Sequence, residues 1–405
     1  MKFEELTLHK KLIDKTYEQG FEELTQIQEK CLPEIIKGKD VVGQAETGSG
    51  KTLAFCLPIL DGVILGAGLQ TVVLTPTREL CVQVTDVFKD FGKILGIKTT
   101  SVYGGISIEP QIKKIRTSEI VVGTPGRMLD HLRRRTLDFR NVRFLVLDET
   151  DKMLEMGFID DVEKIIYHVP KKRQTLMFSA TILGNIHRLM NKHLSNPIVI
   201  KTKSQVDNSK LHQVYYDIHQ QNDKFSLLVH LLKNDTSGLA IVFCATRVES
   251  DVVARNLRHH GINASAIHGG MSQNKRTQSL DALKNQRTDV LVATDVAARG
   301  LDIKNVSHIY NYDVPKTSIE YIHRIGRTAR AGENGAAITL LTGSDHENFR
   351  RVQSNKELNI ERADIPEFKK VSFSRKIDQE KKHSHNKHWN NNQSNNNYRN
   401  YRHRN

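Results

Sequence analysis

The chain has 405 residues, a length that suggests two or three domains. Its 60 Lys and Arg against 46 Asp and Glu give a formal net charge of +14, which favours nucleic acid as a partner, although charge alone also fits a basic protein with no polyanionic ligand. Four scattered cysteines without a Cys-x-x-Cys pair argue against a disulfide framework or a zinc site. We see neither an apolar leader nor a run of about 18 apolar residues, so we expect a cytoplasmic protein with no membrane contact.

Short, continuously apolar runs recur along the first half of the chain, and segments with helical spacing lie between them. The clearest helical spacing is that of Val84, Val87, Phe88, Phe91 and Ile94. Apolar runs that do not alternate with polar residues are typical of strands covered on both faces of a parallel sheet. The predicted strands fall within residues 71–76, 119–125, 142–149, 174–181 and 197–201.

The same pattern restarts after a polar stretch at residues 203–210. Its apolar runs lie within residues 238–246, 264–269, 288–295, 306–315 and 336–342. Strand and helix alternation predicts an α/β protein with two parallel-sheet lobes in tandem. We place the first lobe at 1–203, a linker at 204–212, the second lobe at 213–362 and a tail at 363–405.

The predicted tail is basic and rich in asparagine. Residues 362–405 hold eleven Lys or Arg against four Asp or Glu. From residue 381 onward the sequence is too polar to bury the surface that would offset the entropy of ordering, so we expect the tail to be disordered. Trp389, Tyr398 and Tyr401 lie among basic residues and can stack on unpaired bases, but a solubilising tail is an equally good interpretation.

Polar residues follow many of the predicted strands, at the edge of the sheet where ligands of open α/β folds bind. They are Thr75 to Arg78, Thr124 to Arg127, Asp148 to Asp151, Ser179 to Thr181, Thr246, Arg247, Thr294 and Asp295. This regularity predicts a functional cleft.

A glycine-rich loop in VVGQAETGSGKT, residues 41–52, lies between an apolar run and a helical segment. Such a loop turns backbone N–H groups toward phosphate, Lys51 can reach the β- and γ-phosphates, and Thr52 can bind Mg²⁺. Ala45 stands where the strict phosphate-loop pattern has glycine, so a flexible turn is the alternative.

An acidic cluster follows the apolar run at 145–147. Phosphoryl transfer needs a carboxylate that holds Mg²⁺ and a group that orients the attacking water, and Asp148 and Glu149 suit these two roles. Alone, the cluster would more often be a solvated strand end. Paired with the glycine-rich loop of the same lobe, it predicts ATP hydrolysis with Mg²⁺.

Residues 3–340 resemble the DEAD-box ATP-dependent RNA helicases. The resemblance is carried by GFEELTQIQ (20–28), AETGSGKT (45–52), PTREL (76–80), GG (104–105), TPGR (124–127), LDETD (147–151), SAT (179–181), IVFCATR (241–247), HGGMSQNKR (268–276), ATDVAARGLDI (293–303) and YIHRIGRTARAG (321–332). It implies two RecA-like lobes, with the Q motif of this family within residues 1–29.

For the nucleotide, the resemblance implies that Gln28 faces the adenine edge, Phe3 stacks on the ring and Asp295 contacts the ribose. Lys51, Glu149, Arg327 and Arg330 are the implied catalytic residues, the two arginines as fingers on the γ-phosphate. On their own, these arginines would be surface salt-bridge partners. The loop residues implied to bind ATP are Ala45, Thr47, Gly48, Ser49, Gly50, Lys51 and Thr52.

For RNA, the resemblance implies sequence-independent contacts with the backbone. The implied RNA-binding residues are Thr77, Arg78, Gly105, Thr124, Arg127, Arg247, Gly269 and Thr294. Asp151, Ser179, Thr181 and His323 are implied to couple hydrolysis to strand separation, although Ser179 fits the role of a helix cap equally well.

Three residues depart from the family pattern. Thr150 replaces an alanine, Leu24 replaces a proline, and Ala329 replaces a glycine that is common between Arg327 and Arg330. None of them removes a charged or ligating group, so we expect activity to survive.

We therefore predict an ATP-dependent RNA helicase that acts as a monomer on RNA, with ribosomal or other ribonucleoprotein assemblies as candidate partners. An ATP-gated RNA clamp with little unwinding is the alternative from another functional class, and a DNA translocase is a third. A duplex-unwinding assay separates the first two, and dependence on the ribose 2′-hydroxyl separates both from the third.

Overall fold

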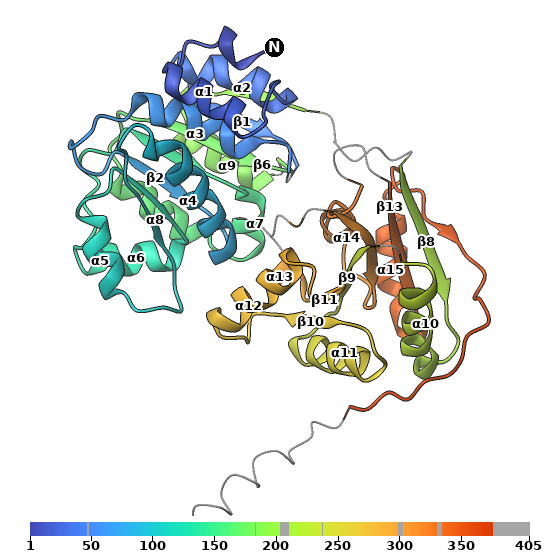
Figure 1. Ribbon diagram of the computed structural model, residues 1–405. Helices are drawn as coiled ribbons and strands as arrows, with labels where there is room; N and C mark the ends of the chain where they lie inside the picture. The colour runs from blue at the N-terminus through green and yellow to red at the C-terminus, as the bar shows by residue number, and fades with distance from the viewer. Residues whose placement is uncertain are drawn as a thin grey trace, which may run out of the picture.

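The computed structural model consists of two α/β lobes, one built from each half of the chain (Figure 1). The structure describes residues 1–46, 48–182, 184–202, 210–236, 238–298, 303, 305–329 and 334–375. The helices of this part of the chain are too short or too polar to span a bilayer.

The first lobe is built on a seven-stranded parallel sheet with strand order β3-β4-β2-β5-β6-β1-β7. Its strands are β1 (Val41–Gln44), β2 (Thr71–Leu74), β3 (Thr99–Val102), β4 (Ile120–Gly123), β5 (Phe144–Leu147), β6 (Gln174–Ser179) and β7 (Ile198–Lys201). Its helices are α1 (Lys10–Glu18), α2 (Gln26–Ile36), α3 (Lys51–Gly62), α4 (Arg78–Lys93), α5 (Glu109–Ile115), α6 (Pro125–Arg133), α7 (Thr150–Glu155), α8 (Ile159–His168) and α9 (Gly184–His193).

The second lobe repeats this architecture with strand order β10-β11-β9-β12-β13-β8-β14. Its strands are β8 (Leu211–Asp217), β9 (Leu239–Phe243), β10 (Ala264–Ile267), β11 (Val290–Ala293), β12 (Val306–Asn311), β13 (Gly335–Leu341) and β14 (Glu361–Arg362). Its helices are α10 (Gln221–Asn234), α11 (Arg247–His259), α12 (Gln273–Lys284), α13 (Asp295–Ala298), α14 (Ser318–Ile325) and α15 (His346–Gln353).

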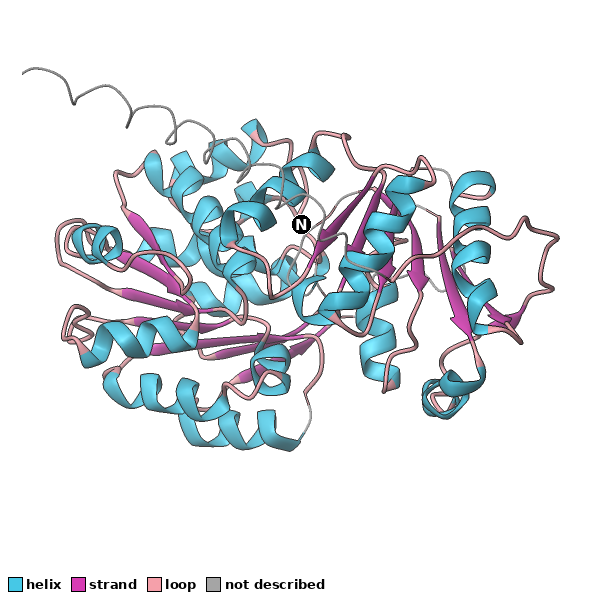
Figure 2. Cartoon of the chain, turned by 90° about the horizontal axis from the view of Figure 1, so that it is seen from below, coloured by secondary structure: helices cyan, strands magenta, loops and turns pink. Residues whose placement is uncertain are grey.

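The central strands are mostly apolar because helices cover both faces of each sheet (Figure 2). In the first lobe, Val73 belongs to one hydrophobic cluster and its chain neighbour Val72 to another, and both side chains are fully buried. Successive strand residues point to opposite faces, so both faces need apolar side chains. The continuous runs therefore correctly predicted a two-lobe parallel α/β fold.

Strands β3 and β8 were not predicted from the sequence because they are polar. The β3 segment reads TTSV, and β8 reads LHQVYYD, whose polar residues other than Gln213 are exposed or half-buried. The strand β8 also begins at Leu211, inside the region that we assigned to the linker. An edge or half-exposed strand needs fewer apolar residues, which removes the signal on which the prediction depended.

The start of the predicted disordered tail was placed too early, because residues 363–375 pack on the second lobe. The Phe373 ring lies 4.7 Å from the Phe225 ring, measured between centroids. The side chain of Asn256 pairs with the backbone of Ser374 through two hydrogen bonds of 2.9 Å. Three well-spaced apolar residues, Phe368, Val371 and Phe373, supply the packing that the basic composition hid. The remainder of the predicted tail, residues 376–405, lies outside the described residues.

Candidate active site

The glycine-rich loop connects β1 to α3, as the sequence predicted. Gly50 is the N-cap of α3 and has φ of 91°, a left-handed conformation that favours glycine. A Cβ atom on Gly50 would lie 2.6 Å from Nε2 of Gln28 and 2.8 Å from Oγ1 of Thr25. Glycine is therefore required here both by backbone conformation and by the close approach of the Q-motif side chains.

The loop holds its own polar groups in place at the start of α3. Nζ of Lys51 donates to the carbonyl of Ala45 at 2.8 Å, and Oγ of Ser49 donates to the carbonyl of Glu46 at 2.8 Å. Lys51 is buried, whereas Gly48 is exposed with φ of 90°. The N-terminus of α3 and an ammonium group thus lie together, which suits a polyphosphate. Thr47 lies outside the described residues.

Gln28 links the Q motif to this loop. Its amide nitrogen donates to the carbonyl of Gly50 at 3.0 Å, and its amide oxygen accepts from the backbone N–H of Thr25 at 3.0 Å. Gln28 is 3% exposed. The structure therefore gives Gln28 a role in fixing the loop, and its contact with the adenine edge stays a prediction.

The stacking role predicted for Phe3 is wrong for this structure. Phe3 has no exposed surface and lies in the hydrophobic core of the first lobe, so its ring cannot face a nucleotide there. Phe21, to which the sequence prediction gave no role, is 42% exposed and lines the cavity at the loop. An aromatic ring left exposed beside Gln28 is the better candidate for stacking on a base.

Asp148 and Glu149 lie at the carboxyl end of β5, and both are 2% exposed. Oδ1 of Asp148 accepts from the backbone N–H of Glu149 at 3.0 Å. Burial and the neighbouring Glu149 raise the pKa of Asp148, whereas Lys51 counteracts them. Burial also raises the pKa of Glu149, but the charges of Lys152, Lys51 and Arg327 outweigh this effect and hold that pKa below its ordinary value. Glu149 thus remains a carboxylate at neutral pH.

The donor set at this strand end fits Mg²⁺. The ion usually takes one or two carboxylates and completes its shell with phosphate oxygens and water. Asp148 supplies a buried carboxylate whose negative charge lacks solvation, and Thr52 supplies a half-buried hydroxyl in the first turn of α3. Both residues line the same cavity.

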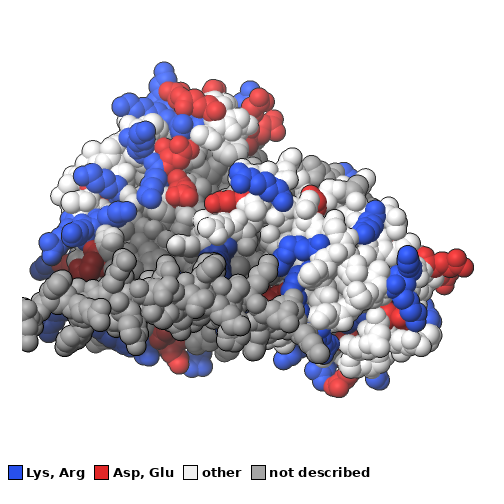
Figure 3. Space-filling model, turned by 60° about the horizontal axis from the view of Figure 1, so that its bottom comes forward, with Lys and Arg blue, Asp and Glu red and all other residues white. Residues whose placement is uncertain are grey.

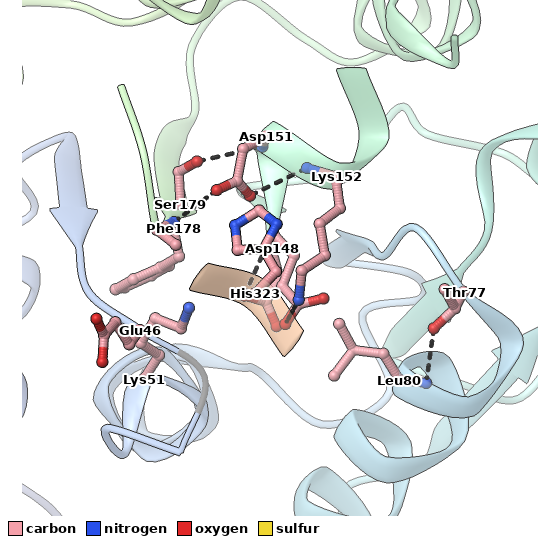
Figure 4. A network of polar contacts seen from close by, with 12 residues as sticks. Glu46, Lys51, Thr77, Leu80, Asp148, Asp151, Lys152, Phe178, Ser179 and His323 are labelled. Atoms are coloured by element: carbon pink, nitrogen blue, oxygen red, sulfur yellow. Dashed lines mark hydrogen bonds and ion pairs between the residues drawn. The ribbon is translucent and has the colours of Figure 1, made fainter. Parts of the chain in front are cut away.

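The residues of the first lobe that are predicted to couple hydrolysis to strand separation meet in one hydrogen-bond network (Figure 4). Oδ2 of Asp151 accepts from the backbone N–H groups of Ala180 and Thr181, both at 3.0 Å. Oγ of Ser179 accepts from the backbone N–H of Asp151 at 3.2 Å and donates to the carbonyl of Thr181 at 2.7 Å. Ser179 therefore accepts a hydrogen bond from the first turn of α7, where Asp151 lies. In this way its hydroxyl caps α7 and connects the end of β6 to the acidic cluster.

Thr150 strengthens the link between β5 and β6. Its hydroxyl lies 3.2 Å from the carbonyl oxygen of Leu147 and 3.3 Å from that of Phe178, and the side chain is 1% exposed. An alanine at this position would leave both carbonyl groups without this donor. The departure from the family pattern therefore adds a contact next to Ser179.

The second lobe brings an imidazole and a guanidinium group to the same place. Nδ1 of His323, on α14, lies 3.9 Å from Oε1 of Glu155 at the end of α7. Arg327 is 4% exposed and is close enough to lower the pKa values of both Glu149 and Lys152. Arg327 of the second lobe therefore lies near the Glu149 carboxylate of the first lobe, and its role as an arginine finger stays a prediction. Arg330 lies outside the described residues.

Asp295 is held by an arginine to which the sequence prediction assigned no role. Nε and Nη2 of Arg324 donate to the two carboxylate oxygens of Asp295 at 2.6 and 2.7 Å. Arg324 also donates to Oδ1 of Asn311 and to the carbonyl of Asp313. The bidentate pair fixes Asp295, and its predicted contact with a ribose stays a prediction.

The predicted RNA-binding residues of the first lobe gather around the loop at 104–106. A Cβ atom on Gly105 would lie 2.2 Å from Nη1 of Arg78, so this glycine makes room for the guanidinium. Nη2 of Arg127 donates to the carbonyl of Ile106 at 3.1 Å. Thr77 is buried and caps α4 by accepting from the N–H of Leu80, whereas Thr124, the N-cap of α6, is half-buried.

In the second lobe, Arg247 is exposed and its guanidinium lies beside Gly269, where a Cβ atom would be 3.5 Å from Nη2 of Arg247. Thr294 is 7% exposed and precedes α13. The two lobes touch close by, because Nη2 of Arg276 lies 2.9 Å from Oε2 of Glu79. Gln273 adds hydrogen bonds to Glu79 and to Arg78. The start of α4 and the start of α12 therefore form a polar contact between the lobes.

A cavity of about 1440 Å³ extends from the phosphate loop between the lobes. Its wall in the first lobe includes Phe21, Gln28, Lys51, Thr52, Asp148 and Glu149. The wall in the second lobe comes from residues that we had not assigned, including Leu239, Leu280 and Val290. The cavity is large enough for a nucleotide.

Comparisons with known proteins agree with this site. The DEAD/DEAH box helicase family matches residues 25–189, and the helicase conserved C-terminal domain matches residues 223–332. The chain is 42% identical over 355 residues to the ATP-dependent RNA helicase CshA of Limosilactobacillus reuteri, covering 87% of this chain and 71% of that protein. It is 41% identical over 367 residues to the DEAD-box ATP-dependent RNA helicase CshA of Geobacillus kaustophilus, covering 90% of this chain and 78% of that protein.

Among solved structures, Dbp5 of S. cerevisiae bound to RNA and ADP BeF3 superposes with a TM-score of 0.82. It is 31% identical, and the match covers 89% of this chain and 95% of that one. The DEAD box protein of Methanococcus jannaschii is 39% identical with a TM-score of 0.54, over 90% of this chain and 99% of that one. The fold and site define a two-lobed nucleotide-dependent enzyme of the RecA-like type. The chain belongs to the DEAD-box ATP-dependent RNA helicase family.

Proposed function

We propose that this RNA helicase hydrolyses ATP at the junction of its lobes and uses the hydrolysis to open short RNA duplexes locally. One observation carries the proposal: the buried Glu149 of the first lobe, the neighbour of Asp148, lies close enough to Arg327 of the second lobe to be affected by its charge. Neither lobe contains both sets of groups, so hydrolysis should depend on the two lobes coming together.

Each residue at the junction has a defined task. Lys51 and the N-terminus of α3 bind the phosphates, and Phe21 stacks on the base. Thr52 and Asp148 would hold Mg²⁺, which, when bound, neutralises charge on the phosphate oxygens. Glu149 orients the attacking water, and Arg327 stabilises the negative charge that develops on the γ-phosphoryl group. Arg330 and the ribose contact of Asp295 belong to the same proposal.

RNA would lie across both lobes, with Arg78 and Arg127 on one side and Arg247 on the other. Arginine side chains that bind phosphates do not contact the bases, so RNA binding should be largely independent of sequence. Basic side chains, with acidic ones between them, lie on both halves of the face drawn in Figure 3. The lobes are arranged much as in Dbp5 bound to RNA and ADP BeF3, which supports RNA-driven closure.

Three properties complete the proposal. The enzyme acts as a monomer, because the first lobe supplies the carboxylates and the second lobe of the same chain supplies the arginine. It works in the cytoplasm, since all four cysteines are free and buried, as expected of a reducing compartment. Ribonucleoprotein assemblies are the proposed targets, because backbone contacts suit structured RNA of any sequence.

The test is to measure ATP turnover and unwinding of a short RNA duplex by the purified full-length chain. We expect ATP turnover to rise at least tenfold on addition of RNA, with little response to DNA of the same sequence. Equal turnover with and without RNA would refute the proposal. RNA-stimulated turnover without strand separation would favour the ATP-gated clamp.

A further inference from the structure

A buried lysine next to the proposed catalytic carboxylate has no role in the function described so far. Nζ of Lys152 lies 2.7 Å from Oε1 of Glu149, and the two side chains are 2% and 3% exposed. Lys152 lies in the first half of α7, three residues after Glu149. Figure 4 shows its side chain reaching into the space that Asp148 borders.

This ion pair is costly to build. Each buried ion loses its solvation by water, which its partner offsets only when the geometry is good. Glu149 also has a left-handed backbone with φ of 50° and ψ of 52°, which is unfavourable for a residue with a side chain. Two costs at one carboxylate indicate that its position is closely specified.

The backbone of Lys152 is fixed by the same network. Its N–H donates to Oδ1 of Asp151 at 3.0 Å and to the carbonyl of Glu149 at 3.0 Å. Asp151 in turn accepts from the N–H groups of Ala180 and Thr181. The backbone of Lys152 is therefore linked through Asp151 to the segment that follows β6, and the ion pair lies entirely within the first lobe.

We propose that Lys152 is a positioning residue for hydrolysis: its ammonium group holds Oε1 of Glu149 so that the carboxylate is set to orient the attacking water. Lys152 touches neither phosphate nor water in this step and exchanges no proton. The inference rests on the proposed role of Glu149. Because the pair is formed within one lobe, the carboxylate is in place before Arg327 of the other lobe arrives.

Two other roles are physically reasonable. The ammonium group could withhold Glu149 from the water, in which case removing Lys152 would raise hydrolysis without RNA. It could also act only in stability, in which case removing it would lower the melting temperature but leave turnover unchanged. The three roles predict different kinetics.

The experiment compares Lys152→Met, which keeps most of the length without the charge, with Lys152→Arg, which keeps the charge. A positioned general base contributes about 10²- to 10⁴-fold to a rate, and we expect Lys152→Met to lose about 10- to 100-fold in kcat at saturating RNA. The KM for ATP should stay within about twofold, because binding groups are untouched. Lys152→Arg should recover most of kcat. Lys164→Met, an exposed lysine paired with Asp161, is the matched control and should have no effect.

A second readout does not depend on hydrolysis. Affinity for a non-hydrolysable ATP analogue with Mg²⁺ and labelled RNA, measured by fluorescence anisotropy, should be the same for Lys152→Met and the wild type. Should Lys152→Met fail to fold, Lys152→Gln, whose amide can still donate to Oε1, should give an intermediate kcat with an unchanged KM. Unchanged kcat in a folded variant, raised RNA-independent turnover, or a changed KM with normal kcat would overturn the inference.

Glu149→Gln separates this inference from the proposed function. Normal hydrolysis by Glu149→Gln would remove Glu149 from catalysis, and the role of Lys152 would fall with it. Inactive Glu149→Gln together with fully active Lys152→Met would leave the proposed function intact and refute the positioning role alone.

Discussion

The two lobes have the same architecture but contribute opposite charges to their junction. The first lobe presents carboxylates: Glu149 near Arg327, Glu79 against Arg276 and Glu155 near His323. The second lobe presents a guanidinium group to Glu149 and to Glu79, and an imidazole to Glu155. The lobes also stabilise their groups differently, since Asp151 is held by backbone N–H groups, whereas Arg324 is held by carboxylate and carbonyl oxygens.

Because of this difference, each lobe supplies a separate part of the proposed active site. The first sheet directs its carboxyl end toward the cavity, whereas the cavity wall in the second lobe includes Leu239 and Val290, the first residues of β9 and β11. Catalysis that needs both carboxylate and guanidinium then depends on the distance between the lobes. Variants that remove a charged group from one lobe should therefore affect closure of the lobes or the hydrolysis of ATP, but not the folding of the other lobe.

The largest effect is expected from Arg327→Lys. An ammonium group cannot reproduce the forked guanidinium at a phosphoryl group, and arginine fingers contribute about 10³-fold or more. We expect kcat at saturating RNA to fall by about 10²-fold or more, measured by phosphate release. Arg134→Lys, at an exposed arginine paired with Asp130, should leave kcat unchanged. Wild-type turnover in Arg327→Lys would mean that the guanidinium group of the second lobe is not required for hydrolysis.

Glu79→Gln tests the contact between α4 and α12. Glu79 and Arg276 are 4% and 10% exposed in their side chains, so neutralising one leaves a buried charge with a weaker partner when the lobes are together. We expect the RNA concentration for half-maximal ATPase activity to rise by about tenfold. The control is Glu34→Gln, whose exposed pair with Lys37 lies within one lobe. An unchanged RNA dependence would show that this contact does not contribute to closure.

Deletion of residues 381–405 should have a smaller effect on RNA binding. The packed segment at 363–375 is retained, so the second lobe should melt as before. Since basic residues that bind phosphates release counterions, we expect RNA affinity to fall several-fold and its salt dependence to become shallower. The ATPase rate at saturating RNA should not change. An unchanged salt slope would reduce the deleted part of the tail to a solubilising segment.

Both lobes of the fold could be predicted from the sequence, because buried parallel strands leave continuous apolar runs. The acidic cluster and the phosphate loop were also predictable, since folding alone seldom requires several carboxylates at a strand end or a glycine-rich turn before a lysine. Phe3 was misassigned because position in a motif says nothing about burial, and Phe3 is entirely within the core. Arg324 was missed because its partner, Asp295, is distant in sequence. Lys152 was missed because the burial of a charged side chain leaves no periodic pattern in the sequence.

The structural consequences of two departures from the family pattern, Thr150 and Ala329, could not be predicted from the sequence. Each of these residues now supports a testable prediction. Thr150→Ala removes the hydroxyl that lies 3.2 Å from the carbonyl oxygen of Leu147. A buried hydrogen bond contributes about 1 kcal/mol, so we expect the first lobe to lose about that amount in its free energy of unfolding. Chemical denaturation followed by fluorescence measures it. ATPase activity should remain, and equal stability would show that the hydroxyl contact is neutral.

Ala329→Gly should have the smallest effect. We expect it to change the stability of the second lobe alone. Ala329 is 2% exposed with φ of 52°, a left-handed conformation that costs alanine about 1 kcal/mol but not glycine. Glycine loses about 0.4–1 kcal/mol through the greater freedom of the unfolded chain, so the two terms partly cancel. We expect the second lobe to gain a few tenths of a kcal/mol, seen as a small rise in its thermal transition, with the first lobe unaffected. A clear loss of stability would mean that the methyl group of Ala329 packs well enough to outweigh its backbone strain.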